Sequence, residues 1–272
     1  MTRTWRQTTA AVAMAVAGGA LGAAATAGAA IVEYPLDSSA TPLARAMADA
    51  NPAVVRRAVF SAVPPGSKPA AVSTTRLAGF PRSGSSYAIL STGNARYARL
   101  PNREPDRGAE SGGPSIRGAR DVTIMRIDLR VPRGANCLSF RYRFLSEEFP
   151  EFVNDLFNDA FIAELGHSDW DASSKADPTI TAPSNFARDS RGNPIRVNAV
   201  GDLSVSPSRS AGTTYDAGTR ILRASTRIRP GLRHLYLSIF DQGDRIYDSA
   251  VFIDKLIVGH RARCKTGVVV DR

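Results

Sequence analysis

Ligands for metal and redox chemistry are scarce in this sequence. It has two cysteines and three histidines among 272 residues, and no Cys-x-x-Cys pair. A zinc or thiol redox centre needs several such ligands at short spacing, so the composition argues against both. Aromatic residues make up 7%, whereas glycine (22) and proline (17) are frequent. Short strands with many turns therefore fit better than long helices, and the 43% hydrophobic content excludes disorder over the whole chain.

Long apolar runs are also missing after the first 30 residues. Arg3 and Arg6 form a basic start, Ala10 to Leu21 is apolar, and Ala-x-Ala triplets follow at 25–27 and 27–29. This pattern predicts a Sec-type signal peptide over residues 1–30, and the alternative is a retained N-terminal anchor. No later stretch is long enough to span a membrane, and no C-terminal sorting tail is visible, so we expect a secreted mature chain.

The sequence is strongly basic, and nearly all of its positive charge comes from arginine. The formal net charge is +10, with 31 arginines against 4 lysines. The basic residues are scattered and lack interleaved aromatic rings that would stack bases, so specific nucleic-acid binding is not predicted. A basic exported protein can still adhere electrostatically to anionic envelope polymers.

The two cysteines are Cys137 and Cys264. In an oxidising compartment a pair is more often bridged than free. We therefore predict a Cys137–Cys264 disulfide.

One helix is indicated. Thr41-Pro42 suits a first helical turn, apolar residues recur at helical spacing as far as Ala50, and Asn51-Pro52 ends the pattern. Residues 53–60 and 87–91 read as strands. Residues 64–86, rich in Pro, Gly and Ser, are predicted to be a loop with short extended pieces, and residues 101–120 are predicted to be a loop.

From residue 121 onward the hydrophobic period is two. Leu138, Phe140, Tyr142 and Phe144 alternate with polar residues, which is typical of strands with one buried and one solvated face. Further strands are expected at 159–165, 195–200, 219–228, 233–240 and 249–258. The prediction is a mostly β protein: one antiparallel β-sandwich or jelly roll over residues 40–262 with a short N-terminal helix. Residues 31–39 and 263–272 are predicted to be short tails.

Acidic residues gather in two segments of this basic chain. No Lys or Arg occurs between Arg143 and Lys175, and a second group of acids follows the strand at 233–240. Massed carboxylates repel one another, so arginine or a hard divalent cation should offset their charge. Calcium takes six to eight oxygen ligands. The oxygen ligands predicted for it are Glu147, Glu148, Asn158, Asp159, Asp241, Asp244 and Asp248. The alternative is that these residues form turns and caps, paired with arginine or hydrated.

Both acidic segments carry a family resemblance. FRYRFLSEEFPEFVNDLFNDAFIAEL at 140–165 and HLYLSIFDQGDRIYDSAVFIDKL at 234–256 resemble, in order, the two hallmark segments of the choice-of-anchor L family. ILSTGNA at 89–95 and the segment 43–60 are also similar to it. The resemblance implies a secreted or surface-displayed bacterial β-rich module of undefined molecular activity. The sequence departs from the family in having Phe149 where tyrosine is usual, and no anchor segment after the domain.

Three functions remain open at this stage. The leading hypothesis is a secreted, non-enzymatic binding or adhesion module whose partner is an extracellular glycan or a surface protein; no catalytic residue is assigned. The alternative is a hydrolase in which Glu148 pairs with Asp244 or Asp248 across a sugar, provided that the two acidic turns meet. The third is a structural envelope or matrix protein held by its basic charge.

Overall fold

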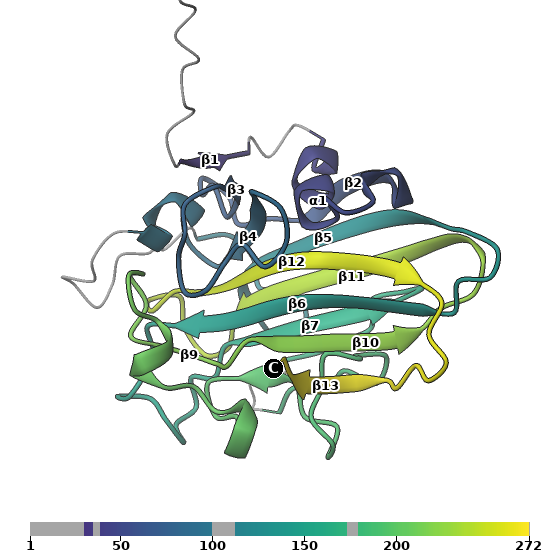
Figure 1. Cartoon of the computed structure of the whole chain (residues 1–272). Helices are drawn as coiled ribbons and strands as arrows, with labels where there is room; N and C mark the ends of the chain where they lie inside the picture. Colours follow the sequence, from purple (N-terminus) through teal and green to yellow (C-terminus); the bar gives the residue numbers. More distant parts are fainter. Residues whose placement is uncertain (1–29, 35–38, 100–111, 173–178, 272) are drawn as a thin grey trace, which may run out of the picture.

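Two antiparallel β-sheets pack face to face to form the protein (Figure 1). The computed structural model describes residues 30–34, 39–99, 112–172 and 179–271. The predicted signal peptide lies outside these residues except for Ala30, and so does much of the loop predicted at 101–120. Among the described residues, no helix is long and apolar enough to cross a membrane.

The larger sheet has the order β1-β3-β4-β12-β6-β10-β13, with β9 paired to β6, and the smaller has the order β2-β5-β11-β7-β8. Every pair of neighbouring strands is antiparallel. The larger sheet is built from β1 (Ile31–Glu33), β3 (Ala70–Ser73), β4 (Tyr87–Ser91), β6 (Cys137–Ser146), β9 (Ala217–Gly218), β10 (Leu222–Arg227), β12 (Ser249–Gly259) and β13 (Gly267–Val270). The smaller is built from β2 (Val55–Ala62), β5 (Arg120–Val131), β7 (Ala160–Leu165), β8 (Ile195–Arg196) and β11 (Gly231–Asp241).

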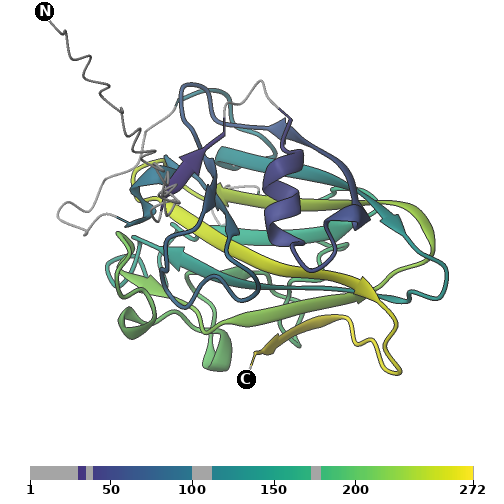
Figure 2. The same ribbon diagram turned by 45° about the horizontal axis from the view of Figure 1, so that its top comes forward.

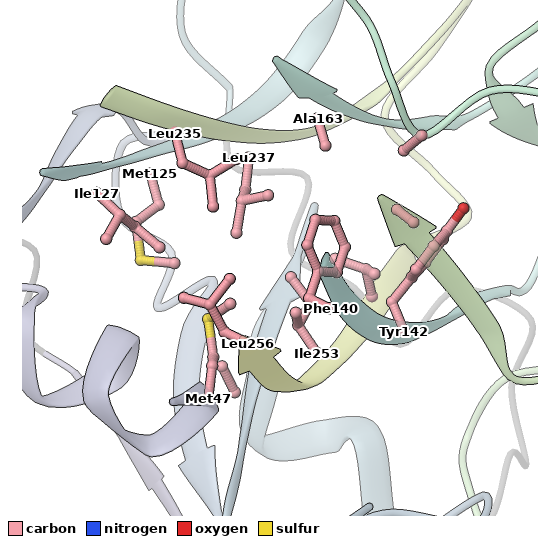
Figure 3. Close-up of a cluster of buried hydrophobic side chains, with 14 of the residues drawn as sticks. Met47, Met125, Ile127, Phe140, Tyr142, Ala163, Leu235, Leu237, Ile253 and Leu256 are labelled. Carbon is pink, nitrogen blue, oxygen red and sulfur yellow. The ribbon is translucent and has the colours of Figure 1, made fainter. Parts of the chain in front are cut away.

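The main core lies between the sheets. Alternate residues of β5 and β11 point inward from one side, and residues of β6 and β12 meet them from the other (Figure 3). Phe140 and Tyr142 pack against Phe161 of β7, with ring centroids 6.2 and 5.1 Å away respectively. Burial of these side chains is the main source of stability, because apolar burial contributes about 25 cal/mol per Å2.

A single α-helix, α1 (Thr41–Met47), covers one edge of the sandwich between β2 and β4 (Figure 2). Pro42 occupies its first turn, where a missing backbone N–H costs nothing. Leu43, Ala44 and Met47 are buried against the core. Short 3-10 helices lie at Pro52–Val54, Ala95–Arg99, Gly201–Leu203 and Pro207–Arg209.

The β-sandwich with one short N-terminal helix is confirmed, as are the helix start at Thr41 and the strand at 87–91. Two predicted tails are corrected, because β1 pairs with β3 and β13 pairs with β10. These edge strands are three and four residues long, too short to display a hydrophobic period. The strand predicted at 195–200 is reduced to the two residues of β8.

The predicted solvated face of β6 is also corrected. Ser139 is buried, and Arg143 is half-buried where a second apolar cluster and its loops cover part of the outer face of the larger sheet. Phe80, Tyr87 and Phe252 form the centre of this cluster, with ring centroids 5.3–6.0 Å apart. Long loops in the first third of the chain therefore create a small core of their own.

Strand registers bring six strand ends to one rim of the sandwich. In the smaller sheet the end of β11 faces the starts of β5 and β7, through the pairs Asp241↔Arg120 and Phe240↔Ala160. In the larger sheet the start of β12 faces the ends of β6 and β4, through Ser249↔Ser146 and Ala250↔Ser91. The β6–β7 and β11–β12 connections, which carry both acidic segments, therefore lie at the same rim.

Candidate functional site

Buried carboxylates gather at this rim. Six of them have relative exposures of 5% or less, although acidic residues are rarely buried unless they are paired. They come from the start of β5, the end of β11, and the β6–β7 and β11–β12 connections. We call them the rim carboxylates: Asp121, Glu147, Glu148, Asp159, Asp241 and Asp248.

Asp159, at the end of the β6–β7 connection, links the two acidic segments. Its Oδ2 accepts a hydrogen bond from Ser249 Oγ at 2.7 Å, and its Oδ1 accepts one from the backbone N–H of Gln242 at 3.2 Å. Its own backbone N–H donates to Glu148 Oε2 at 3.3 Å. Asp241 lies beside it: burial and then the charge of Asp159 raise the pKa of Asp241, whereas the hydrogen bond between the two side chains lowers the pKa of Asp159. The side chain of Asp159 therefore joins the two sheets through the acidic loops.

Asp248 joins the same loops on the other side. Its carbonyl oxygen accepts the backbone N–H of Glu147 at 3.0 Å, and its Oδ1 lies 3.4 Å from the Thr92 hydroxyl. The carboxylate lies directly against the Cα of Gly93, where an added Cβ would come within 1.9 Å of Asp248 Oδ2. Glu147 Oε1 accepts a hydrogen bond from Thr214 Oγ1 at 3.1 Å. A side chain at position 93 would thus displace one of the rim carboxylates.

Burial dominates the electrostatics of this rim. It raises the pKa of Asp159 to about 7, although hydrogen bonds from Ser249 and Gln242 act in the opposite direction. Burial and the charge of Asp159 hold the pKa values of Glu148 and Asp241 well above the ordinary range. Burial also raises the pKa of Asp248, followed by the charge of Glu147. At neutral pH the carboxylates therefore gain from any bound proton or cation.

Arginine neutralises little of this charge. Arg245 Nε lies 3.6 Å from Asp121 Oδ1. Within the described residues, Glu148, Asp159, Asp241 and Asp248 take part in no ion pair. The Asp241 side chain interacts with Thr92 and Asp159, neither of which brings a positive charge. An unpaired buried carboxylate is costly, so the structure leaves a need for a neutralising group beside Asp241.

The donor set suits a hard cation, but it is not arranged as a finished metal site. Carboxylate and hydroxyl oxygens are the ligands that Ca2+ prefers. Across the residues the structure describes, no group of three or more His, Cys, Asp or Glu has the arrangement needed to hold a metal ion. Glu148 and Asp241 each contact Asp159.

Comparison with protein families assigns the chain. The model of the choice-of-anchor L domain matches residues 75–256, which include both acidic segments. The chain belongs to this family. The resemblance found in the sequence is thereby confirmed, whereas α1 and β2 lie outside the matched residues. A comparison with curated proteins gives no match.

Two solved structures have a weak similarity of fold to this chain. The carbohydrate-binding module TmCBM61, in complex with β-1,4-galactotriose, has a TM-score of 0.31 at 8% identity, covering 75% of this chain and 88% of that chain. The K2 cleaved adhesin domain of Lys-gingipain has a TM-score of 0.28 at 8% identity, covering 71% of this chain and 82% of its own.

The choice-of-anchor L domain brings most of the seven predicted ligands to one rim, and two of them also accept hydrogen bonds from loop backbone. Asn158 Oδ1 accepts the backbone N–H of Asn198 at 3.1 Å. Asp244 is half-buried, and its Oδ1 accepts the N–H of Ile246 at 3.2 Å within its own turn. Its charge still contributes to the raised pKa of Glu148 and Asp159. Both side-chain oxygens accept hydrogen bonds from backbone N–H groups, and a role of these two residues in metal binding remains a prediction.

Sequence reasoning missed four contributors to the rim: Asp121, Thr92, Gly93 and Ser249. Thr92 and Gly93 lie in the ILSTGNA segment, which carried the family resemblance but had no assigned role. Ser249 follows Asp248 directly, yet it points to Asp159 because it begins β12. Asp121 opens a strand and has a positive φ of 39°, which no pattern of spacing signals.

Two of the three carboxylates suggested for hydrolysis are buried. Glu148 is 1% exposed and Asp248 is 5% exposed, so a sugar would reach them only if the loops moved, whereas Asp244 is half-buried. A separate trio near the surface, His167, Asp169 and Ser184, resembles a catalytic triad only in composition. Asp169 Oδ2 and Ser184 Oγ both contact the same His167 nitrogen, at 3.0 and 3.1 Å. A triad needs contacts on opposite ring nitrogens.

Proposed function

We propose that this choice-of-anchor L domain is a non-enzymatic binding module of the bacterial cell exterior, and that a calcium ion among the rim carboxylates orders its loops. Its partner would be an extracellular polysaccharide or a surface protein. The observation that supports the proposal is the burial of Asp159 and Asp241 side by side, with no ion pair to either within the described residues. Family membership supports the location.

The non-enzymatic part of the proposal rests on how little access a substrate has to the buried carboxylates. A general acid or base must come within hydrogen-bond reach of the substrate. Glu148 and Asp248 are buried under the loops that carry them, and their neighbours are other carboxylates. A role in building a rigid rim is consistent with that position, because binding loops work best on a fixed scaffold.

A bound calcium ion would neutralise the buried carboxylates, which otherwise lose their charge only by binding protons. Its oxygen ligands would come from Glu148, Asp159, Asp241 and Asp248, with backbone carbonyls completing the six to eight positions. Because no three of these acids have the arrangement of a metal site in the described residues, binding would draw their side chains toward Asp159. The β6–β7 and β11–β12 connections would become less mobile as a result.

Thermal melting tests the calcium part. A ligand that binds the folded state at 100 times its dissociation constant adds about 2.7 kcal/mol, so the melting temperature with calcium should exceed that with chelator by roughly 5–10 °C. Asp241→Asn should abolish this difference. Glu164→Gln, which changes a buried carboxyl in the middle of β7, should keep it. Equal melting of the unaltered protein with calcium and with chelator would remove the metal from the proposal.

Binding assays test the module part. The labelled protein should bind isolated bacterial envelopes or a member of a glycan panel saturably, and it should release no product from them. Retention that is abolished by moderate salt and never saturates would instead favour a structural protein held by charge. Turnover that disappears in Glu148→Gln, with folding intact, would favour the hydrolase.

A further inference from the structure

A basic groove lies on the connection between β12 and β13, far in sequence from most of the rim carboxylates. This connection crosses the ends of β6 and β10 to reach β13 at the edge of the larger sheet (Figures 1 and 2). A pocket of about 500 Å3 opens beside it. A second pocket of about 390 Å3 continues from the first and shares Arg263, Cys264 and Lys265 with it.

Cationic side chains dominate the lining of both pockets. We call them the groove cations: Arg188, Arg223, Arg227, Arg261, Arg263 and Lys265. One acid, Asp189, lies among them, and its carboxylate accepts hydrogen bonds from the backbone N–H groups of Arg191 and Asn193 at 2.8 Å. None of the groove cations forms an ion pair with a described residue. Their charge is therefore available to a ligand.

The backbone that carries these cations is fixed while the side chains stay exposed. The Cys137–Cys264 disulfide attaches the middle of the segment to the start of β6. Asn136 holds Arg261 through two hydrogen bonds of 2.9 and 3.0 Å, and Ser225 Oγ donates to the Lys265 carbonyl at 2.6 Å. Arg261, Arg263 and Lys265 are exposed. A fixed backbone lowers the entropy that binding must overcome.

We propose that this groove binds an acidic polysaccharide. The inference rests on the proposed function, because it names the ligand class and the place of binding. Arginine side chains match carboxylate and sulfate groups with paired hydrogen bonds. The groove cations extend over two connected pockets rather than converging on one point, which suits a chain with repeating negative charges better than a single small anion.

A polysaccharide is favoured over a nucleic acid by the groove itself. Neither pocket has an aromatic residue in its lining, whereas single-stranded nucleic acids are commonly held by stacking on aromatic rings. The disulfide also belongs to oxidising, extracellular surroundings, where envelope polysaccharides are the abundant polyanions.

Titration calorimetry with polygalacturonate tests the proposal. The full chain should bind this carboxylated polymer, with an affinity that falls as sodium chloride is added, and should not bind its methyl ester. The variant Arg261→Gln/Arg263→Gln/Lys265→Gln should bind at least about tenfold more weakly. The matched control Arg56→Gln/Arg57→Gln/Arg130→Gln removes three exposed positive charges from the smaller sheet and should change affinity less than about twofold. Dextran sulfate, which carries sulfate but no carboxylate, distinguishes sulfate from carboxylate as the preferred anion.

Three results would overturn the inference: no binding to either acidic polymer, an equal loss in both triple variants, or tighter binding of single-stranded DNA that is lost in the groove variant. Failure of the groove proposal can be distinguished from failure of the proposed function. If the groove variant still binds envelopes saturably, the module function stands and its ligand lies elsewhere. If the unaltered chain shows no saturable envelope binding, the proposed function fails whatever polygalacturonate does.

Discussion

Buried acids recur in this molecule outside the rim as well, and Glu164 of β7 is an instructive example. It is fully buried, opposite Tyr236 of β11, and its Oε1 accepts the backbone N–H of Asp169 at 2.9 Å. Its other oxygen has no hydrogen-bond partner among the described residues. Burial raises the pKa of Glu164 to about 7, and the nearby Asp169 carboxylate acts in the same direction, although the N–H of Asp169 opposes it.

A raised pKa makes stability depend on pH with a definite sign. Between about pH 4.5 and 7 the unfolded chain loses the Glu164 proton while the folded chain keeps it, so the free energy of unfolding falls as pH rises through that range. Glu164→Gln should flatten this part of the profile, and its stability relative to the unaltered protein should increase until about pH 7. Urea unfolding at a series of pH values measures this difference. Asp202→Asn, an exposed acid, is the control, and parallel profiles for Glu164→Gln and the unaltered protein would contradict the prediction.

Among elements, β6 differs most from its sequence pattern. Alternation predicted a solvated face through Arg141 and Arg143, but the structure covers part of that face with two loops. Arg143 Nη1 donates to the carbonyls of Ala78 and Arg209 at 2.7 and 2.8 Å. Burial, and then the charges of Arg209 and Arg82, lower the pKa of Arg143 to about 10. The periodicity identified the strand correctly but could not indicate that distant loops would fold over its outer face.

Arg143 should therefore stabilise the domain although its position in the strand predicts an exposed side chain. Arg143→Met keeps most of the aliphatic stem and leaves the carbonyls of Ala78 and Arg209 without their donor, so we expect a loss of about 2 kcal/mol in the free energy of unfolding. Arg223→Met is the matched control. It lies on the same face of the next strand, opposite Arg141, and donates no hydrogen bond among the described residues, so its loss should stay below about 0.5 kcal/mol. Chemical denaturation compares the two, and equal losses would refute the role given to Arg143.

Across the whole molecule, the sequence was sufficient to predict the strands and the helix that have a clear local residue pattern. The long strands at 137–146 and 231–241 show clear alternation, and the helix at 41–47 has a proline start, although it ends at Met47 instead of reaching the predicted end at Ala50. Edge strands such as β13 could not be predicted, since four residues form a strand only because β10 is beside them. The acidic segments were found from composition, but the partners Thr92 and Asp121 come from other strands and meet them only through strand register.

The disulfide affects the molecule as a whole, because it connects residues separated by 127 positions. It ties the start of β6, in the middle of the larger sheet, to the connection that leads from β12 to β13. Closing so long a loop restricts the unfolded chain, and by the chain-entropy model this stabilises the fold by up to about 4–5 kcal/mol. The prediction from two lone cysteines is confirmed, and its consequence can be measured directly.

Cys137→Ser/Cys264→Ser should lower the free energy of unfolding by about 2–5 kcal/mol. Reductant should lower the stability of the unaltered protein to that of the variant and should leave the variant unchanged, which separates loss of the bond from any effect of the serines. The same variant should bind polygalacturonate more weakly, because the segment bearing Arg261, Arg263 and Lys265 would be held by Asn136 and Ser225 alone among these anchors. Unchanged stability in the variant, with or without reductant, would mean that strand pairing of β13 with β10 already fixes this end of the sheet.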